Sequence, residues 1–300
     1  MATFVDGPVR VTVPATSANL GPGFDSLGLA LDLRDELSAE VCRTGLEIEV
    51  EGAGEADVAR DESHLVVRAM RAAFEAMDAA PTGLRLHCRN RIPHARGLGS
   101  SSAAIVGGLA LARALVAGGS LLLDDDAVFD LAVRLEGHPD NVAPAFYGGF
   151  VISGSEDGTS YAVGAPVDPR VSAVVFVPPV GVSTEKARGL LPESVPHAHA
   201  AADAGRAALL VAALGGQPEQ LWRATRDFLH QDYRRPAMPD SLALVDELRG
   251  DGIAALVSGA GPTVLAFTAG GQAGLDLLAR CPSGWEALPL AVDHRGALVL

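Results

Sequence analysis

The chain has 300 residues and carries 37 Asp and Glu against 23 Lys and Arg, which gives a formal net charge of −14. This charge argues against an extended partner with a phosphate backbone, so no nucleic acid partner is expected. No stretch of 18 apolar residues occurs, so we expect no membrane span. Lys186 is the only lysine, and the other 22 cations are arginines. Any mechanism that needs a lysine must therefore use Lys186.

The cysteines and the N-terminus bear on the cellular compartment. Cys42, Cys88 and Cys281 are widely spaced and form no C-x-x-C pair, so reduced and mostly buried thiols are expected. Residues 1–13 show no basic segment followed by an apolar one. We therefore expect no secretory signal, and a cytoplasmic location.

The first half of the chain opens with strands and continues with helices. Residues that alternate in polarity or are β-branched predict strands at 9–14, 24–33, 36–42, 46–51, 83–90 and 149–153. Apolar residues at helical spacing predict helices at 63–77, about 101–116 and 124–135. Residues 156–168 have little periodicity and contain Gly158, Gly164 and Pro166. A domain boundary is predicted there.

The same kinds of pattern restart beyond that boundary. Strands are predicted at 170–177, 253–258, 263–268, 287–292 and 297–300, and helices at 184–191, 204–214, 218–231, 240–248 and near 272–280. Runs of strands followed by runs of helices predict an α+β fold. We expect two domains, residues 1–163 and 164–300.

The sharpest local pattern is the Gly/Ser segment, residues 93–104, which reads P-H-A-R-G-L-G-S-S-S-A-A. Its glycines would let the backbone approach a ligand, its serines supply donors, and the following helix N-terminus attracts anions. These properties favour a cradle for nucleotide phosphates, although a serine helix cap would explain part of the pattern. The Gly/Ser segment does not match three known nucleotide-binding patterns. A Walker loop needs Gly-Lys, and a dinucleotide-binding loop needs Gly where Ser102 stands. A protein kinase needs a lysine on a strand.

Two other Gly-rich segments, residues 14–25 and 257–263, each join two predicted strands. Simple turns would explain either segment alone. The glycines of residues 257–263 would also let the backbone approach a neighbouring phosphate site.

A fourth cluster, residues 136–144, places Glu136, His138, Asp140 and Asn141 within six positions. Mg²⁺ takes few protein oxygens besides phosphate and water, so one carboxylate near the Gly/Ser segment would suffice. A single histidine without a partner at ligand spacing makes zinc a poor fit.

Together these segments resemble the GHMP kinase superfamily and, within it, the homoserine kinases. The superfamily resemblance rests on P-x-x-x-G-L-G-S-S-S-A-A at 93–104 and S-G-A-G-P-T at 258–263. The narrower resemblance rests on P-A-T-S-A-N-L-G-P-G-F-D at 14–25, H-P-D-N-V-A-P at 138–144, S-T-E-K-A-R at 183–188 and H-Q-D-Y-R-R-P-A-M-P at 230–239. It runs in order through nearly the whole chain.

The resemblance implies an N-terminal domain with a left-handed β-α-β unit and a ferredoxin-like C-terminal domain, with the active site between them. It implies transfer of the γ-phosphoryl group of ATP to the side-chain hydroxyl of L-homoserine, a step toward threonine. Mg²⁺ as cofactor and a homodimer are implied as well.

The resemblance also assigns site residues. Around the triphosphate it places Pro93, His94, Ala95, Arg96, Gly97, Leu98, Gly99, Ser100, Ser101, Ser102 and Ala103. It assigns Mg²⁺ to Ser101 and Glu136, and homoserine to Asn19, Asp25, His138, Arg188, Arg234, Gly259 and Gly261, with Thr184 and Asn141 beside the reacting phosphoryl group.

The residue types assigned to homoserine are those that an amino-acid substrate needs. An amino acid needs a carboxylate to face its ammonium group and an arginine fork for its carboxylate, which Asp25, Arg188 and Arg234 would supply. Each arginine alone would read as a solvated surface cation. The neighbouring Arg235 leaves the choice of anchoring arginine open.

The catalytic base is also open. Many sugar and mevalonate kinases of this superfamily resemble each other in pairing a catalytic Asp with a Lys, whereas Asn141 stands near that role here. We hypothesise direct attack by the substrate hydroxyl without a dedicated base, with Asp140 as the remaining candidate. Two alternatives are a superfamily kinase for another small alcohol, such as mevalonate or a sugar, and a non-catalytic metabolite-binding homologue.

Overall fold

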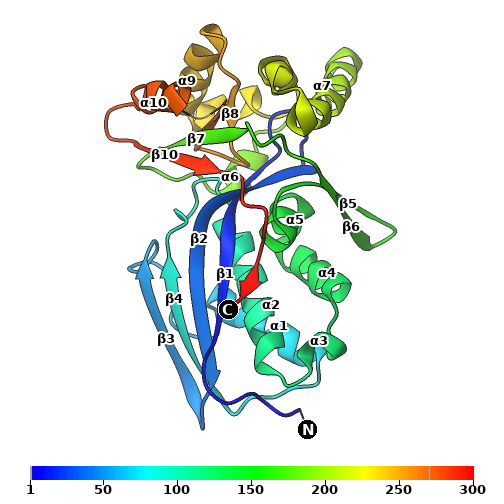
Figure 1. Cartoon of the computed structure of the whole chain (residues 1–300), viewed down its shortest axis with the longest axis vertical. Helices are drawn as coiled ribbons and strands as arrows, with labels where there is room; N and C mark the ends of the chain where they lie inside the picture. The colour runs from blue at the N-terminus through cyan, green and yellow to red at the C-terminus, as the bar shows by residue number, and fades with distance from the viewer. Residues whose placement is uncertain (1, 270) are drawn as a thin grey trace.

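The computed structural model describes residues 2–269 and 271–300. Its strands form a seven-stranded sheet and a four-stranded sheet (Figure 1). Among the described residues, no helix has the length and apolar character that a membrane crossing requires.

The seven-stranded sheet lies in the first half of the chain and takes one strand from the C-terminus. It consists of β1 (Val9–Ala18), β2 (Leu27–Val41), β3 (Gly45–Gly52), β4 (Gly83–Asn90), β5 (Phe150–Glu156), β6 (Thr159–Ala165) and β11 (Leu298–Val299). All of its pairs are antiparallel except β3 with β4, which are parallel and are joined through α1 (Leu65–Ala76). These three elements form a β-α-β unit.

Helices cover one face of this sheet (Figure 1). They are α1, α2 (Ser100–Leu115), α3 (Gly119–Leu122), α4 (Asp125–Glu136) and α5 (Pro139–Tyr147). The central helix α2 is buried nearly all round, and small residues let its neighbours approach. A side chain at Gly108, for example, would meet the Val66 carbonyl of α1 at 2.5 Å. This close packing explains the Ala- and Gly-rich sequence of α2.

The four-stranded sheet has the order β10-β7-β9-β8, with every neighbouring pair antiparallel. Its strands are β7 (Ser172–Val177), β8 (Ala255–Val257), β9 (Val264–Thr268) and β10 (Glu286–Ala291). The helical segments are α6 (Thr184–Arg188), α7 (His197–Gly216), η1 (Pro218–Gln220), α8 (Leu221–Ala224), η2 (Asp232–Ala237), α9 (Pro239–Gly250) and α10 (Gly271–Leu278). The succession strand, helices, two strands, helix, strand in this order is ferredoxin-like, so that prediction is confirmed.

The chain ends back on the first sheet. Val292 bridges to Leu31 of β2, and β11 pairs with β1 through Val11 and Val299 (Figure 1). The division of the chain at residues 163 and 164 stays a prediction, with the C-terminal strand lying in the sheet of the first part.

Several predicted elements differ from the structure. The two strands predicted at 24–33 and 36–42 are one strand, β2, because a bulge takes up the interruption: Pro14 faces Arg34 whereas Ala15 faces Leu31. No strand is predicted within residues 156–168, where β6 pairs along β5 in a hairpin, and the domain boundary in this stretch stays a prediction. No element was assigned to residues 139–147, which form α5 with Pro139 in its first turn.

The helix predicted at 218–231 is also wrong beyond Ala224. The Asp227 carboxylate accepts hydrogen bonds from the backbone N–H groups of Leu229, His230 and Gln231 at 2.7–3.1 Å. A side chain that binds these N–H groups competes with helical bonding and holds an irregular turn.

Of the three cysteines, all free, only Cys88 is buried.

Candidate active site

Three Gly-rich segments that are distant in sequence meet at the N-terminus of α2. The Thr16 N–H donates to the Leu98 carbonyl at 3.0 Å, and the Ser258 hydroxyl donates to the Gly97 carbonyl at 2.6 Å. Gly259 joins the third segment to the first through its N–H, which donates to the Ala18 carbonyl at 3.1 Å. The Gly/Ser segment is therefore held between residues 14–25 and 257–263.

The glycines of the Gly/Ser segment are required by this contact. Gly97 and Gly99 have φ of +75° and +70°, which L side chains rarely adopt. A Cβ on Gly97 would overlap the Ser258 carbonyl, and one on Gly99 would overlap the Thr16 hydroxyl. Leu98 between them is fully buried, and its carbonyl is the acceptor for the Thr16 N–H.

The N-terminus of α2 faces this junction with free donors. Gly99 caps the helix without a side-chain hydrogen bond, and the first intrahelical bond runs from Ala103 N–H to the Gly99 carbonyl. The N–H groups of Ser100, Ser101 and Ser102 thus lack intrahelical partners and carry the positive end of the helix dipole. This geometry suits an anion such as a polyphosphate.

A cavity of about 260 Å³ opens at this helix end. It brings together side chains from both halves of the chain, and Lys186 is not among them. The lining residues are Asn19, Ala95, Arg96, Gly97, Gly99, Ser100, Ser101, Glu136, His138, Asp140, Asn141, Val182, Ser183, Thr184, Arg188, Arg234, Gly259, Ala260 and Gly261.

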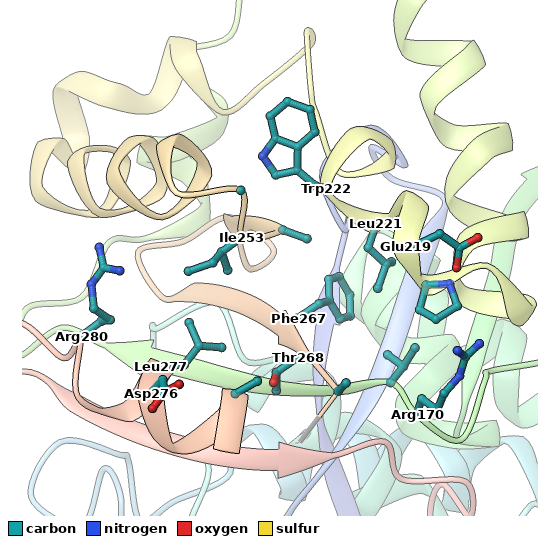
Figure 2. Close-up of a pocket in the computed structure, with 16 residues that line it drawn as sticks. Arg170, Glu219, Leu221, Trp222, Ile253, Phe267, Thr268, Asp276, Leu277 and Arg280 are labelled. Carbon is teal, nitrogen blue, oxygen red and sulfur yellow. The ribbon is translucent and has the colours of Figure 1, made fainter. Parts of the chain in front are cut away.

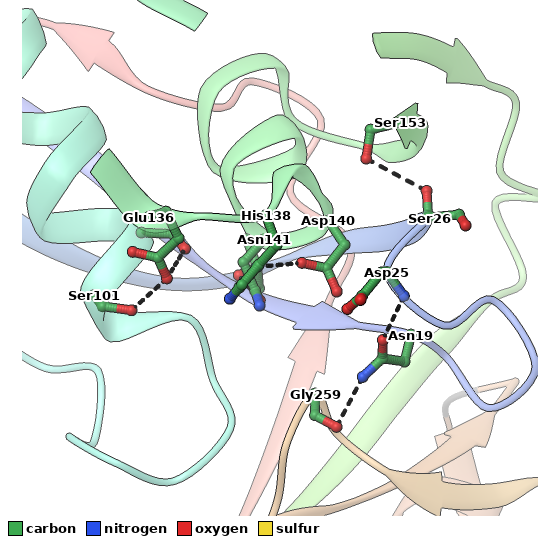
Figure 3. Close-up of polar contacts among 12 residues, drawn as sticks. Asn19, Asp25, Ser26, Ser101, Glu136, His138, Asp140, Asn141, Ser153 and Gly259 are labelled. Carbon is green, nitrogen blue, oxygen red and sulfur yellow. Dashed lines mark hydrogen bonds and ion pairs between the residues drawn. The ribbon is translucent and has the colours of Figure 1, made fainter. Parts of the chain in front are cut away.

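Glu136 closes one side of the cavity. Its carboxylate accepts hydrogen bonds from the hydroxyls of Ser101 at 2.6 Å and Ser102 at 2.9 Å (Figure 3). Glu136 is the last residue of α4, and Gly137, with φ +93°, turns the chain into α5. The Ser101 hydroxyl and the Glu136 carboxylate form an all-oxygen donor pair beside the helix N-terminus, which fits Mg²⁺.

The first turn of α5 supplies the next polar group. His138 Nδ1 lies 2.6 Å from Asp140 Oδ1, and Asp140 is 2% exposed (Figure 3). Burial lowers the pKa of His138, but the hydrogen bond and charge of Asp140, together with the charge of Glu136, outweigh it and raise that pKa. The hydrogen bond to Asp140 therefore favours the charged form of His138. Asn141 Oδ1 accepts from the Thr16 hydroxyl at 2.7 Å.

Residues 19–25 form a strained turn beside the cavity. Asn19, Leu20 and Asp25 all have φ between +50° and +64°. Asn19 holds the turn on both sides: its Oδ1 accepts from the Asp25 N–H at 2.9 Å, and its Nδ2 donates to the Gly259 carbonyl at 2.9 Å (Figure 3). The turn thereby aims Asp25 at Arg188, whose guanidinium binds both carboxylate oxygens.

Two cations of the cavity, Arg96 and Arg234, have no carboxylate partner among the described residues, and Arg96 is held by the carbonyls of His94, Pro178 and Pro179, whereas Arg234 is buried. Arg234 is 1% exposed, its Nε has no hydrogen-bond partner, and Nη1 donates to the Gly259 carbonyl at 3.1 Å and contacts His230 Nδ1 at 3.0 Å. Burial and the charge of Arg188 lower its pKa to about 10. Arg235, in contrast, pairs with surface aspartates and lies outside the cavity. The structure therefore favours Arg234 as the anchoring arginine.

Sequence reasoning missed a second cavity of about 310 Å³ that shares Ser100 and Ser101 with the first. His64 and His94 line it, burial lowers the pKa of both, and His64 Nδ1 has no partner among the described residues. The remaining wall is Asp35, Leu37, Val58, Ala59, Ser63, Leu65, Val66, Asn90 and Ala104. Apart from the residues of the Gly/Ser segment, no short motif marks this cavity, because its other residues come from separate segments of the chain.

A larger cavity of about 570 Å³ lies elsewhere, between the four-stranded sheet and α8, α9 and α10 (Figure 2). Its walls are mostly apolar and include Leu221, Trp222, Ile253 and Phe267. It contains none of the predicted site residues. Size alone does not locate the chemistry, so we assign the site to the polar cavity at the N-terminus of α2.

The comparisons with known proteins agree with this geometry. Residues 64–149 match the GHMP kinases N terminal domain, and residues 200–286 match the GHMP kinases C terminal domain. The fold is thus that of a GHMP kinase, and the chain belongs to that family.

Comparison with individual proteins identifies the family within the GHMP kinases. Homoserine kinase of Streptomyces avermitilis is 55% identical over 97% of this chain and 95% of its own length. The crystal structure of homoserine kinase from Cytophaga hutchinsonii superposes with a TM-score of 0.85 over the whole of both chains at 26% identity. That of a putative homoserine kinase from Listeria monocytogenes gives 0.76 at 32% identity, over 97% of this chain and 99% of the other. Within the GHMP kinases, the chain is a member of the homoserine kinase family.

Proposed function

We propose that the chain transfers the γ-phosphoryl group of ATP to the side-chain hydroxyl of L-homoserine, giving O-phospho-L-homoserine and ADP in the synthesis of threonine. The observation that carries the substrate assignment is Arg234, a buried cation in the cavity that lacks a carboxylate partner. Such a group is costly to bury alone and gains most from an anionic ligand. The α-carboxylate of homoserine supplies that anion.

The substrate is a zwitterion whose ammonium and carboxylate groups are both attached to the α-carbon, so both charges must be met on one side of the site. Arg188 is occupied by Asp25, so Arg234 is the free fork for the substrate carboxylate. Asp25 and Asp140 offer negative charge on the same side of the cavity as both arginines, and the substrate ammonium group would lie toward them. We keep Asn19, His138, Gly259 and Gly261 as further substrate contacts, since all four line the cavity.

ATP would occupy the two cavities that share Ser100 and Ser101. The phosphates would lie over the N-terminus of α2, and the base would enter the second cavity. Bound Mg²⁺ would neutralise phosphate charge, held by Ser101 and Glu136. Four of the predicted nucleotide residues line neither cavity and would act through the backbone or through packing: Pro93, Leu98, Ser102 and Ala103.

The proton of the substrate hydroxyl would pass to an oxygen of the transferring γ-phosphoryl group, without a dedicated protein base, as the bond between the γ-phosphorus and the leaving ADP oxygen breaks. Asp140 Oδ1 is hydrogen-bonded to His138 Nδ1, and Asn141 Oδ1 accepts from the Thr16 hydroxyl. With both groups engaged in these contacts, alignment of the hydroxyl with the γ-phosphate and charge stabilisation would supply the rate. Thr184 lines the cavity beside this position. A homodimer and a cytoplasmic location stay predictions.

The test is ADP release from ATP and Mg²⁺ with L-homoserine, compared with mevalonate and galactose as acceptors. We expect homoserine to be the preferred acceptor. Arg234→Gln should raise the KM for homoserine by about 100-fold, because a charge-assisted fork is lost, while the KM for ATP changes little. Arg235→Gln removes a neighbouring surface arginine and should leave both constants near wild type. A faster reaction with another alcohol would overturn the proposal.

The base-free step has its own test. Asp140→Asn should retain phosphoryl transfer, with a change mainly in homoserine affinity because a charge beside the ammonium group is removed. Loss of transfer with unchanged affinities for homoserine and ATP would identify Asp140 as the base instead.

A further inference from the structure

Four arginines from separate segments converge on a pocket of about 430 Å³ that the proposed reaction does not use. Arg206 lies on α7, Arg223 on α8, Arg226 just beyond α8 and Arg249 on α9. The other residues of this arginine pocket are Trp222, Thr225, Asp227, Gln231, Asp232, Leu242, Val245, Asp246 and Gly250. Four positively charged side chains so close together need an explanation in a chain whose net charge is −14.

None of these arginines has an ion pair within residues 2–269 and 271–300. Arg249 donates only to neutral oxygens, the Thr225 hydroxyl and the carbonyls of Trp222 and Ala255, at 2.7–3.2 Å. Burial, followed by the charges of Arg226 and Arg206, lowers the pKa of Arg249. The guanidinium groups therefore lie close enough to repel one another.

The three aspartates of the pocket are already engaged elsewhere. The Asp227 carboxylate accepts from three backbone N–H groups of the following turn. Asp232 and Asp246 both bind Arg235, each at 2.9 Å. Together with Arg235, the four arginines outnumber these three aspartates by two, so the pocket keeps a net positive charge.

We propose that the arginine pocket binds a small oxyanion, either a phosphate ester or a polycarboxylate, at a site separate from the phosphate cradle of α2. Planar guanidinium forks match the paired oxygens of both groups. The pocket is large enough for a metabolite of several atoms beyond the anionic group. Arg206 and Arg223 make no side-chain hydrogen bond, ion pair or ring contact among the described residues, which leaves their donors available to a ligand.

The test uses the whole chain with saturating ADP, so that the cradle at α2 is filled. Inorganic phosphate and citrate are titrated separately while the melting temperature is followed, which gives an apparent Kd for each anion. We expect a saturable rise in melting temperature with at least one of them. The Arg206→Gln/Arg223→Gln variant should raise that Kd at least about tenfold, because two of four charged donors are removed.

A matched control keeps the loss of charge constant. Arg43→Gln/Arg68→Gln removes two exposed arginines that line no described pocket and should leave the Kd unchanged. Binding of phosphate alone would assign a phosphate ester, and binding of citrate alone a polycarboxylate. The proposal is overturned if neither anion gives a saturable shift, or if Arg206→Gln/Arg223→Gln binds as wild type does. Because binding is read directly, the result does not depend on the proposed reaction.

Discussion

Arg188 and Asp25 form a two-pronged ion pair, with Nη2 to Oδ1 at 2.6 Å and Nη1 to Oδ2 at 3.0 Å. The pair joins the strained turn of residues 19–25 to the C-terminal end of α6, and hence the two halves of the chain that face the cavity. Both side chains remain about one-third exposed, so the pair fixes the position of the turn and still presents charge at its surface.

Breaking this pair should weaken homoserine binding more than it weakens the fold. Asp25→Asn and Arg188→Gln should each raise the KM for homoserine by about tenfold, and the double variant should cost less than their product, because each single variant leaves one charge unpaired. The control is the exposed two-pronged pair of Asp168 and Arg170. Asp168→Asn should leave the KM unchanged; an equal effect there would argue against a role for Asp25 in binding.

The role of Gly99 can be tested against a glycine that has a similar positive φ. Gly99→Ala places a Cβ against the Thr16 hydroxyl at φ +70°, whereas Gly118→Ala at φ +75° meets nothing within 4 Å. Both should lower the free energy of unfolding by about 1–2 kcal/mol, the cost of a left-handed alanine. Only Gly99→Ala should also lower kcat/KM, by about 100-fold, because the Gly/Ser segment must shift. Equal kinetics for the two variants would show that the contact with Thr16 is dispensable.

The proposed metal ligands predict a change in magnesium dependence. Glu136→Gln should raise the Mg²⁺ concentration for half-maximal activity about tenfold, and Ser101→Ala should act in the same direction, because each removes an oxygen ligand. Glu75→Gln removes an exposed carboxylate of α1 and serves as the control. A loss of activity at Glu136 that excess Mg²⁺ does not relieve would place this carboxylate outside the metal site.

The second cavity predicts that nucleotide and acceptor binding can be separated. Ala104→Leu adds side-chain volume on the face of α2 that lines this cavity, and should raise the KM for ATP about tenfold with little effect on the KM for homoserine. Ala127→Leu on α4 is the matched enlargement of a half-buried alanine that lines no described pocket. An unchanged KM for ATP in Ala104→Leu would exclude the base from this cavity.

The sequence allowed prediction of those parts of the site that lie in short contiguous segments. Gly97 and Gly99 mark a loop of close approach, and Asp25, Arg188 and Arg234 stand in patterns specific enough to be compared with a family. The second cavity and the arginine pocket could not be predicted, since their walls come from four or five segments each and depend on tertiary packing. The helix predicted at 218–231 failed for a local reason, because the Asp227 carboxylate binds backbone N–H groups that a helix would use.

The last prediction concerns pH. The folded-state pKa of His138 is raised, since Asp140 and Glu136 outweigh burial, so protonated His138 stabilises the fold fully below its ordinary pKa of 6.5. That stabilisation is lost as the pH rises through the raised value. In Asp140→Asn, burial should instead lower the pKa of His138, and the pH dependence of this group should reverse. Burial also raises the pKa of Asp35 to about 6 and that of Asp203 to about 7, but both contribute equally in the two proteins.

Urea unfolding at pH 5.5 and pH 8.5 measures this difference. The free energy of unfolding of wild type relative to Asp140→Asn should fall by about 1 kcal/mol between these values, in line with about 1.4 kcal/mol per unit of pKa. His138→Gln removes the titrating group, so adding Asp140→Asn to it should give a difference that does not vary over this range. If the free energy of unfolding of wild type relative to Asp140→Asn instead grew with pH, burial would dominate the pKa of His138. Asp140 would then lack a charged histidine partner, and its case as the catalytic base would be stronger.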